Sequence, residues 1–282
     1  MRAALRLLRP ANVAVSFVGT VVGGLAAAAV GIGASRTVWG LLALAATSTA
    51  LVTAAGNVLN DLGDVEGDRK NHPERPLVTG EVTIPGARRL TMALFLGGIV
   101  VAIPVSLVHP WVGVILAVAV AGLLAYELRW KARGLVGNLT VAGLTAMVFL
   151  YGGAAAGRPE VVFPFAAMAF LATLSREVIK DMEDVAGDIA RSTVPKVHGM
   201  AAASVLARAS VGAAIALSLT PFLWYLAPTS WAGLAYGAVV LAADVVFIVS
   251  VAWLPHRLRL EQTVSKGAMA LALGAFLAVA FR

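Results

Sequence analysis

Two acidic segments, about 120 residues apart, hold the residues of this chain that are best suited to chemistry. The first is NDLGDVEGD at positions 60–68, and the second is KDMEDVAGD at positions 180–188. The pattern D-x-x-D-V-x-G-D occurs in both, and each copy follows a long apolar stretch. No structural requirement explains the same acidic pattern twice, so the repetition indicates a shared chemical task.

Each segment is expected to present its carboxylates on one helical face. Positions i, i+3 and i+7 lie on the same side of an α-helix. The first face would carry Asn60, Asp61, Asp64 and Asp68, and the second Asp181, Asp184 and Asp188. Three carboxylates on one face repel one another, so a cation is expected among them.

The ligand types narrow the choice of cation. Oxygen ligands without histidine or cysteine suit magnesium or calcium, and magnesium keeps part of its coordination shell for water and ligand phosphates. Two such faces suggest a diphosphate that is clamped between metal ions. For either copy alone, the alternative is a run of solvated loop charges.

Basic residues alternate with the acids, which a site that only traps cations would not favour. A magnesium diphosphate needs them, because its anionic oxygens accept hydrogen bonds from arginine and lysine. The candidates near the two segments are Arg69, Lys70, Arg75, Arg176 and Lys180. Every one of them also contributes to the charge bias expected of a membrane protein, so none is decisive alone.

The composition indicates where these segments lie. The chain has 282 residues, of which 60% are hydrophobic and 13% are charged, whereas soluble domains have about 25% charged residues. We therefore predict an all-α, polytopic membrane protein. The basic residues that give the net charge of +7 are spread between apolar stretches, so binding of nucleic acid is not expected. The sequence has no cysteine, which excludes thiolate chemistry.

Nine apolar stretches are long enough to cross a bilayer. They lie near 12–33, 38–59, 88–108, 111–127, 134–156, 161–180, 203–226, 232–253 and 264–281. The basic residues fall almost entirely in alternate loops, with only Arg36, Arg158 and Arg282 on the opposite side. The positive-inside rule then places the N-terminus and both acidic segments on the cytoplasmic side.

These motifs resemble those of the UbiA-type intramembrane prenyltransferases. The family pattern N-D-x-x-D-x-x-x-D matches positions 60–68, and D-x-x-x-D matches Asp184 and Asp188. The stretch PERPL at 73–77 resembles the P-x-R-P loop of the family, and YELRWKARGLVGN at 126–138 resembles its tyrosine–lysine loop. The resemblance implies one transmembrane domain over 1–282, with pseudo-repeats of roughly 1–130 and 131–282 around a central cavity.

Two segments narrow the resemblance within the family. RPAN at 9–12 and REVIKDMED at 176–184 are most similar to the archaeal digeranylgeranylglyceryl phosphate synthases of the cell membrane. This implies magnesium-dependent transfer of a geranylgeranyl group to the free hydroxyl of geranylgeranylglyceryl phosphate, an ether lipid. The alternative is an aromatic prenyltransferase, whose acceptor would be 4-hydroxybenzoate, homogentisate or a related compound. A cation-coupled transporter is a more distant alternative, because the acidic residues of a transporter would lie near the bilayer midplane.

The resemblance also implies roles for single residues. Asn60, Asp64 and Asp68 would hold one magnesium ion and Asp184 and Asp188 a second, with Asp61 and Asp181 as direct or water-mediated partners. Arg9 is a candidate for an acceptor phosphate, as are Arg176 and Lys180, and Lys131 for the diphosphate. Tyr126 fits either a cavity wall facing a carbocation or an interfacial tyrosine, and Asn12 fits either acceptor contact or helix capping.

Overall fold

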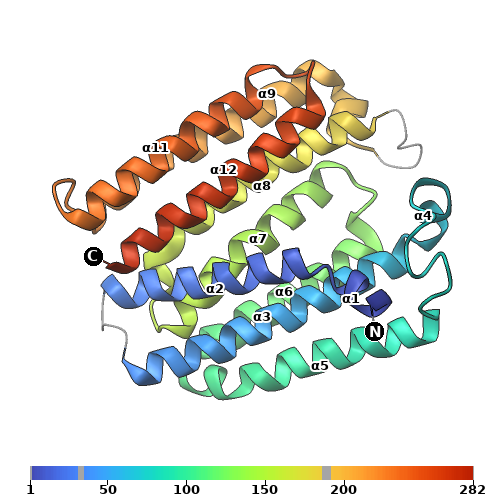
Figure 1. Cartoon of the computed structure of the whole chain (residues 1–282), viewed down its shortest axis with the longest axis horizontal. Helices are drawn as coiled ribbons and strands as arrows, with labels where there is room; N and C mark the ends of the chain where they lie inside the picture. Colours follow the sequence, from blue (N-terminus) through green and yellow to red (C-terminus); the bar gives the residue numbers. More distant parts are fainter. Residues whose placement is uncertain (1, 31–34, 186–191, 282) are drawn as a thin grey trace.

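The computed structural model describes residues 2–30, 35–185 and 192–281, and within these ranges the chain is helical without any strand (Figure 1). The first half contains α1 (Arg2–Leu8), α2 (Pro10–Val30), α3 (Arg36–Gly63), α4 (Val65–Asn71), α5 (Ile84–Val108), α6 (Pro110–Ala125) and a π-helical turn, η1 (Tyr126–Trp130). The second half contains α7 (Leu135–Ala155), η2 (Pro159–Val162), α8 (Phe163–Asp184), α9 (Val194–Leu217), α10 (Thr220–Trp224), α11 (Trp231–Ala252), α12 (Leu258–Ala278) and η3 (Val279–Phe281).

The predicted number of membrane spans is confirmed for the described residues. Nine helical segments there are long and apolar enough to cross a bilayer. A helix satisfies its backbone hydrogen bonds internally, which the hydrocarbon core demands. Two helices begin earlier than hydropathy predicts: α12 starts at Leu258 rather than near 264, and α9 at Val194 rather than near 203, with a kink at Gly199, where φ is +83° and ψ is 163°. In both cases the first turns carry polar residues that a hydropathy window rejects. The two pseudo-repeats and the central cavity stay predictions.

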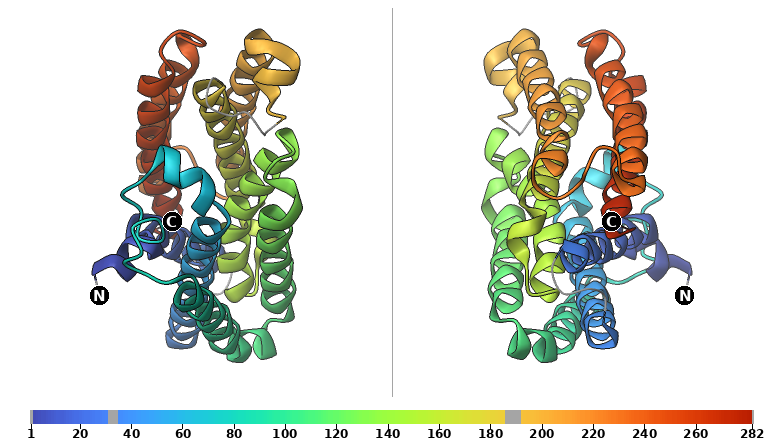
Figure 2. Two further views of the ribbon diagram at one scale, coloured as in Figure 1. Left: turned by 90° about the vertical axis from the view of Figure 1, so that its right-hand side faces the viewer. Right: turned by 90° about the vertical axis from the view of Figure 1, so that its left-hand side faces the viewer.

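The helices form one bundle in which the first and last spans meet. α2 packs on α7, α7 on α8, and α8 on α12, while α12 and η3 return to α2. α3 and α5 pack together on one side, and α9 and α11 complete the other (Figures 1 and 2). Segments far apart in the sequence thus become neighbours.

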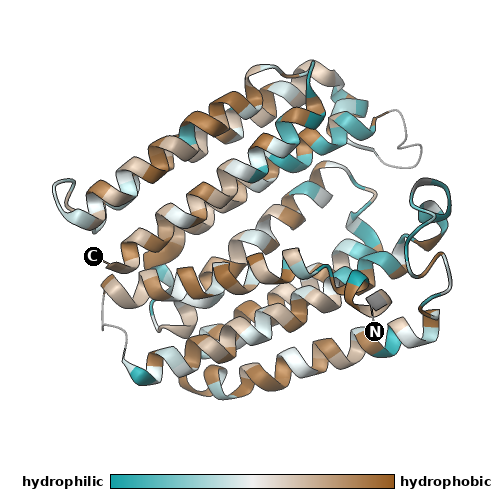
Figure 3. Ribbon diagram, in the orientation of Figure 1, coloured by the Kyte–Doolittle hydropathy of each residue, from teal (hydrophilic) through white to brown (hydrophobic). Residues whose placement is uncertain are grey.

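Hydrophilic residues gather at one end of this bundle (Figure 3). α4, η1, the last turns of α8 and the first turns of α12 all lie there, at the right-hand side of Figure 1. The ends of α3 and α8, which carry the two acidic segments, therefore face the same side of the membrane.

Glycine allows α2 and α7 to pack closely together. A Cβ atom at Gly152 of α7 would lie 2.0 Å from the carbonyl oxygen of Thr20 on α2, and one at Gly23 would lie 2.6 Å from the carbonyl oxygen of Phe149. Lipid offers no hydrophobic force between helices, so close backbone packing through small residues stabilises such pairs. The position of α2 therefore depends on glycine on both helices.

We predict that Gly152→Ala destabilises the protein although alanine favours a helix by about 1 kcal/mol over glycine. The new methyl group would force α2 and α7 apart, and overpacking of this kind costs about 1–3 kcal/mol. Tryptophan fluorescence during heating in detergent measures the effect. Gly143→Ala on the same helix is the matched control, because nothing lies within 4 Å of its Cβ position. Equal unfolding temperatures for the two variants would contradict the prediction.

Candidate active site

The first acidic segment is not one continuous helix. α3 ends at Gly63, Asp64 lies between helices with φ −98° and ψ 1°, and α4 begins at Val65. The carboxylates have different partners: Arg75 Nη1 donates to Asp61 Oδ1 at 3.3 Å and to Asp68 Oδ2 at 2.6 Å, whereas Asp64 pairs with Lys131. The break falls next to a glycine, which disfavours helix, yet Asp64 N still donates to the Asn60 carbonyl at 3.0 Å and Asp68 N to the Asp64 carbonyl at 2.8 Å. That the three aspartates share one face stays a prediction.

Arg9 reaches the same aspartate from the other side. Its guanidinium pairs with Asp61 and lies 3.4 Å from Asn60 Oδ1. The backbone of Arg9 has φ +51° between α1 and α2, and Asn57 Nδ2 fixes this turn by donating to the Leu8 carbonyl at 2.8 Å. The predicted Arg9 thus joins a group of two buried carboxylates and two partly exposed guanidinium ions, in which the charges balance.

A second group forms around Asp64. Lys131 Nζ lies 2.8 Å from Asp64 Oδ1 and 3.0 Å from Glu127 Oε2, and Glu127 Oε1 accepts from Asn60 Nδ2 at 2.8 Å. Asp64 and Glu127 carry two negative charges and Lys131 one positive charge, which leaves one negative charge in excess. The aromatic ring of Tyr126 lies 6.0 Å from Lys131 Nζ, so Tyr126 belongs to this end of the bundle.

The second acidic segment ends α8. Asp181 is buried, and Asn138 Nδ2 of α7 donates to its Oδ2 atom at 2.7 Å. Asp184, one turn further, is exposed and has a polar partner. Asp188 lies outside the described residues. Among the acidic residues of this segment that the structure describes, Asp181 alone is buried.

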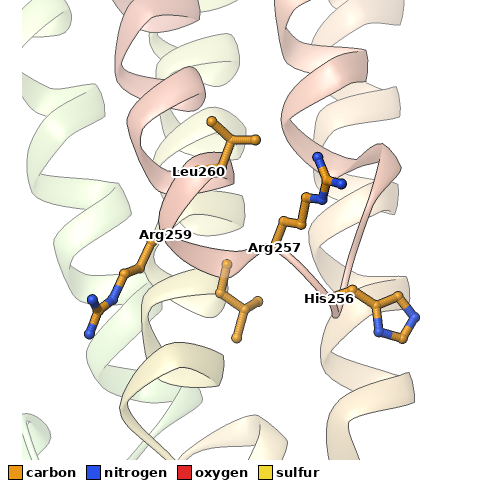
Figure 4. Close-up of a pocket in the computed structure, with 5 residues that line it drawn as sticks. His256, Arg257, Arg259 and Leu260 are labelled. Atoms are coloured by element: carbon orange, nitrogen blue, oxygen red, sulfur yellow. The ribbon is translucent and has the colours of Figure 1, made fainter.

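A tether from α12 fixes the last turn of α8. Glu183 accepts from Arg259 Nε at 3.1 Å and from Gln262 Nε2 at 2.7 Å. Figure 4 shows that the side chains of Arg257, just before α12, and Arg259, in its first turn, point in different directions. The guanidinium of Arg257 stacks over Trp253 at 5.2 Å instead. The shallow hollow in Figure 4 is lined by residues 256–260 and contains no acidic residue of the two segments.

The other predicted residues lie further from these groups. Arg69, Lys70 and Lys180 are exposed at the same end, and Arg176 pairs with the adjacent Glu177 at 2.8 Å. Asn12 is exposed in the first turn of α2. Because that helix begins at Pro10, Asn12 is not its cap, and this part of its expected role is wrong.

Three contact residues were not predicted as site residues from the sequence: Asn57, Glu127 and Asn138. Each acts on a residue that is distant in the chain, and although Glu127 and Asn138 lie in the stretch that resembles the tyrosine–lysine loop, the sequence does not indicate these contacts. Glu127 gave one sequence signal, because it stands four residues before Lys131, at the spacing of a helical ion pair. Nothing in the sequence indicated that it would also reach Asn60.

The loop after α4 is fastened to α1. Arg6 pairs with Glu81 and also donates to the carbonyl oxygen of Glu74 at 3.5 Å. The hydrogen bond from Arg6 lowers the pKa of the Glu81 carboxyl below its ordinary value. These contacts bracket Arg75, whose backbone carbonyl accepts from Val78 and Thr79.

Comparison with known proteins places the chain in a family. Residues 16–279 match the model of the UbiA prenyltransferase family. The chain belongs to this family, and it is a prenyltransferase of the membrane. This membership excludes the transporter alternative.

Individual relatives are similar over most of the chain. A protein of Methanoculleus marisnigri named digeranylgeranylglyceryl phosphate synthase is 38% identical over 86% of this chain and 83% of its own length. A solved structure described as a digeranylgeranylglyceryl phosphate synthase in membranes has a TM-score of 0.81 at 26% identity, covering 99% of this chain and 98% of that one. A UbiA homologue from Archaeoglobus fulgidus, bound to DMAPP and Mg²⁺, has the same fold, with a TM-score of 0.73, 21% identity and 99% coverage of both chains.

We predict that Arg75→Ala lowers the unfolding temperature, because it removes a cation shared by two buried carboxylates. Breaking a buried ion pair by removing one partner costs about 3–5 kcal/mol of stability. Because Arg9 still pairs with Asp61 in this variant, we expect a loss of about 3 kcal/mol or less. Thermal unfolding in detergent measures it. Arg89→Ala, at an exposed position of α5, is the control. Adding Asp68→Asn to Arg75→Ala should restore part of the stability, and a failure to do so would contradict this electrostatic origin.

Proposed function

We propose that this prenyltransferase moves a geranylgeranyl group from its diphosphate to the free hydroxyl of geranylgeranylglyceryl phosphate. The observation that carries the acceptor assignment is the 38% identity with a protein named for this synthesis, over 86% of the chain. The paired acidic and basic groups at the ends of α3 and α8 support the diphosphate half of the assignment. In this reaction the allylic carbon–oxygen bond of the diphosphate breaks and the diphosphate departs, while a bond from the acceptor oxygen to that carbon forms. The proton of the acceptor hydroxyl passes to a carboxylate of the acidic segments or to the departing diphosphate.

The residues of the second group suit magnesium. Asn60 and Asp64 supply hard oxygen atoms, and the group keeps one negative charge in excess once Glu127 and Lys131 are counted. Magnesium is typically bound by one or two carboxylates, with substrate phosphates completing its shell. The described residues hold no ready cluster of three acidic or histidine ligands, which fits a metal that arrives together with a diphosphate. We assign Asn60, Asp64 and Asp68 to one ion and Asp184 and Asp188 to another.

The remaining residues prepare the site for the anionic substrate. Magnesium, when bound, would act as a Lewis acid on the departing diphosphate. Arg75 and Lys131 each sit between two carboxylates, so either cation is placed to turn toward phosphate oxygens when the acids take metal. Arg9, at the joint before α2, is our candidate for a phosphate of the acceptor, and Lys180, which is exposed at the end of α8, is another. The apolar interior of the bundle would keep water from a carbocation.

The chain offers a simple means to determine sidedness. We propose that the chain is a multi-pass protein of the cell membrane and is surrounded by membrane lipids. In this orientation the N-terminus and the polar end of the bundle face the cytoplasm. The sequence has no cysteine, so single cysteines can report accessibility. In intact cells, we predict that a membrane-impermeant maleimide labels Thr229→Cys, in the loop between α10 and α11, and spares Glu74→Cys. The reverse pattern would overturn the orientation, and both sites should label after lysis.

Transfer itself is tested with purified protein, magnesium and labelled geranylgeranyl diphosphate. Geranylgeranylglyceryl phosphate is offered beside 4-hydroxybenzoate and homogentisate. We predict that only the glycerol phosphate is prenylated, that EDTA abolishes transfer, and that Asp64→Ala or Asp184→Ala lowers kcat/KM at least about 100-fold, which corresponds to about 2.7 kcal/mol. Glu160→Ala, far from both acidic segments in the chain, is the control.

The outcomes separate the two halves of the proposal. Prenylation of an aromatic acceptor alone would refute the ether-lipid assignment and leave the diphosphate site in place. Transfer that persists in EDTA would refute the magnesium assignment.

A further inference from the structure

Glu127 connects two residues of the candidate active site that are distant in the sequence. One carboxylate oxygen accepts from Asn60 Nδ2 at 2.8 Å, and the other accepts from Lys131 Nζ at 3.0 Å. Its side chain is only 9% exposed. A carboxylate that is nearly buried and bonded through both oxygens is held in one orientation, because leaving either contact would cost a charge-assisted hydrogen bond.

Two backbone features bring this carboxylate to α3. The segment Tyr126–Trp130 forms a π-helical turn, in which Lys131 N donates to the Tyr126 carbonyl at 2.9 Å; such turns interrupt α-helices and are frequent at functional sites. On the opposite helix stands Gly63, where a Cβ atom would lie 2.9 Å from Glu127 Oε2. The absence of a side chain at Gly63 leaves room for the carboxylate.

The chemistry of the contact determines how the Asn60 carboxamide is turned. An ionised carboxylate only accepts hydrogen bonds, so the amide group of Asn60 must face Glu127 with its nitrogen. The oxygen Oδ1 then points the other way, where Arg9 Nη2 lies 3.4 Å from it. An amide with its oxygen turned toward the site can bind a cation, whereas the reversed amide would present hydrogen atoms to it.

We propose that Glu127 is a positioning residue for prenyl diphosphate binding: it fixes the Asn60 carboxamide with its oxygen toward the metal position and keeps Lys131 beside Asp64. This inference rests on the proposed function, since it assumes that Asn60 and Asp64 hold a metal–diphosphate complex. It adds an acidic residue outside both aspartate segments to the binding site.

A reciprocal exchange of the two side chains tests the proposal. Asn60→Asp alone places two carboxylates together, and Glu127→Gln alone removes the charge and allows either amide orientation. Each should weaken binding of magnesium with inorganic pyrophosphate about tenfold and raise KM for geranylgeranyl diphosphate similarly, which is about 1.4 kcal/mol. The double variant Asn60→Asp/Glu127→Gln restores a donor–acceptor pair and the net charge, so we expect affinity within about threefold of the unchanged protein.

Calorimetric titration in detergent, with KM and kcat measured in parallel, gives the readouts. Rescue in the double variant, with unfolding temperatures of both single variants equal to that of the unchanged protein, supports positioning, since a purely structural role would lower the unfolding temperature together with the affinity. Equal affinity for Glu127→Gln and the unchanged protein, or losses that simply multiply in the double variant, would overturn the inference. Failure of the unchanged protein to bind magnesium pyrophosphate would instead refute the proposed diphosphate site, and is seen before any variant is made.

Two glycine variants supply an independent test in which Glu127 is not substituted. Gly63→Ala should push the Glu127 carboxylate away from α3 and weaken pyrophosphate binding severalfold, with little change in unfolding temperature. Gly40→Ala, on the same helix with nothing within 4 Å of its Cβ position, should bind as the unchanged protein does. Equal binding by both glycine variants would contradict the close approach on which the proposal depends.

Discussion

The arrangement of the active-site end depends on one electrostatic constraint: carboxylates at the end of apolar helices must be matched by cations. Burying an unpaired charge costs several kcal/mol, and the ends of α3 and α8 border a medium that solvates charge poorly. Arg75 meets this constraint for Asp61 and Asp68. The loop after α4 must therefore fold back over α3, and α1 must lie close enough to add Arg9.

The same constraint explains why the site has two parts with different charge. Around Arg75 the charges of two acids and two arginines cancel, whereas around Lys131 one negative charge remains. The first part contributes to the stability of the resting protein. The second retains an affinity for further positive charge, which suits a metal that is delivered with its substrate.

Much of the architecture could be predicted from the sequence, because bilayer thickness imposes a minimum length on apolar helices and positive charge marks alternate loops. The polar starts of α9 and α12 were missed, since they are helical without being apolar. At the site, the repeated aspartate pattern identified both acidic segments. The break at Asp64 and the contacts of Glu127 and Asn138 could not be predicted, because they depend on which helices become neighbours after folding.

The attachment of Arg9 has a practical consequence for handling the protein. α1 leads directly into the residue whose guanidinium pairs with Asp61, and Asn57 holds the joint between α1 and α2. A fluorescent label attached to α1 would therefore pull on the candidate active site through one short helix. α12 runs toward the opposite end of the bundle (Figure 1), so a label attached to its last turns lies away from the candidate active site.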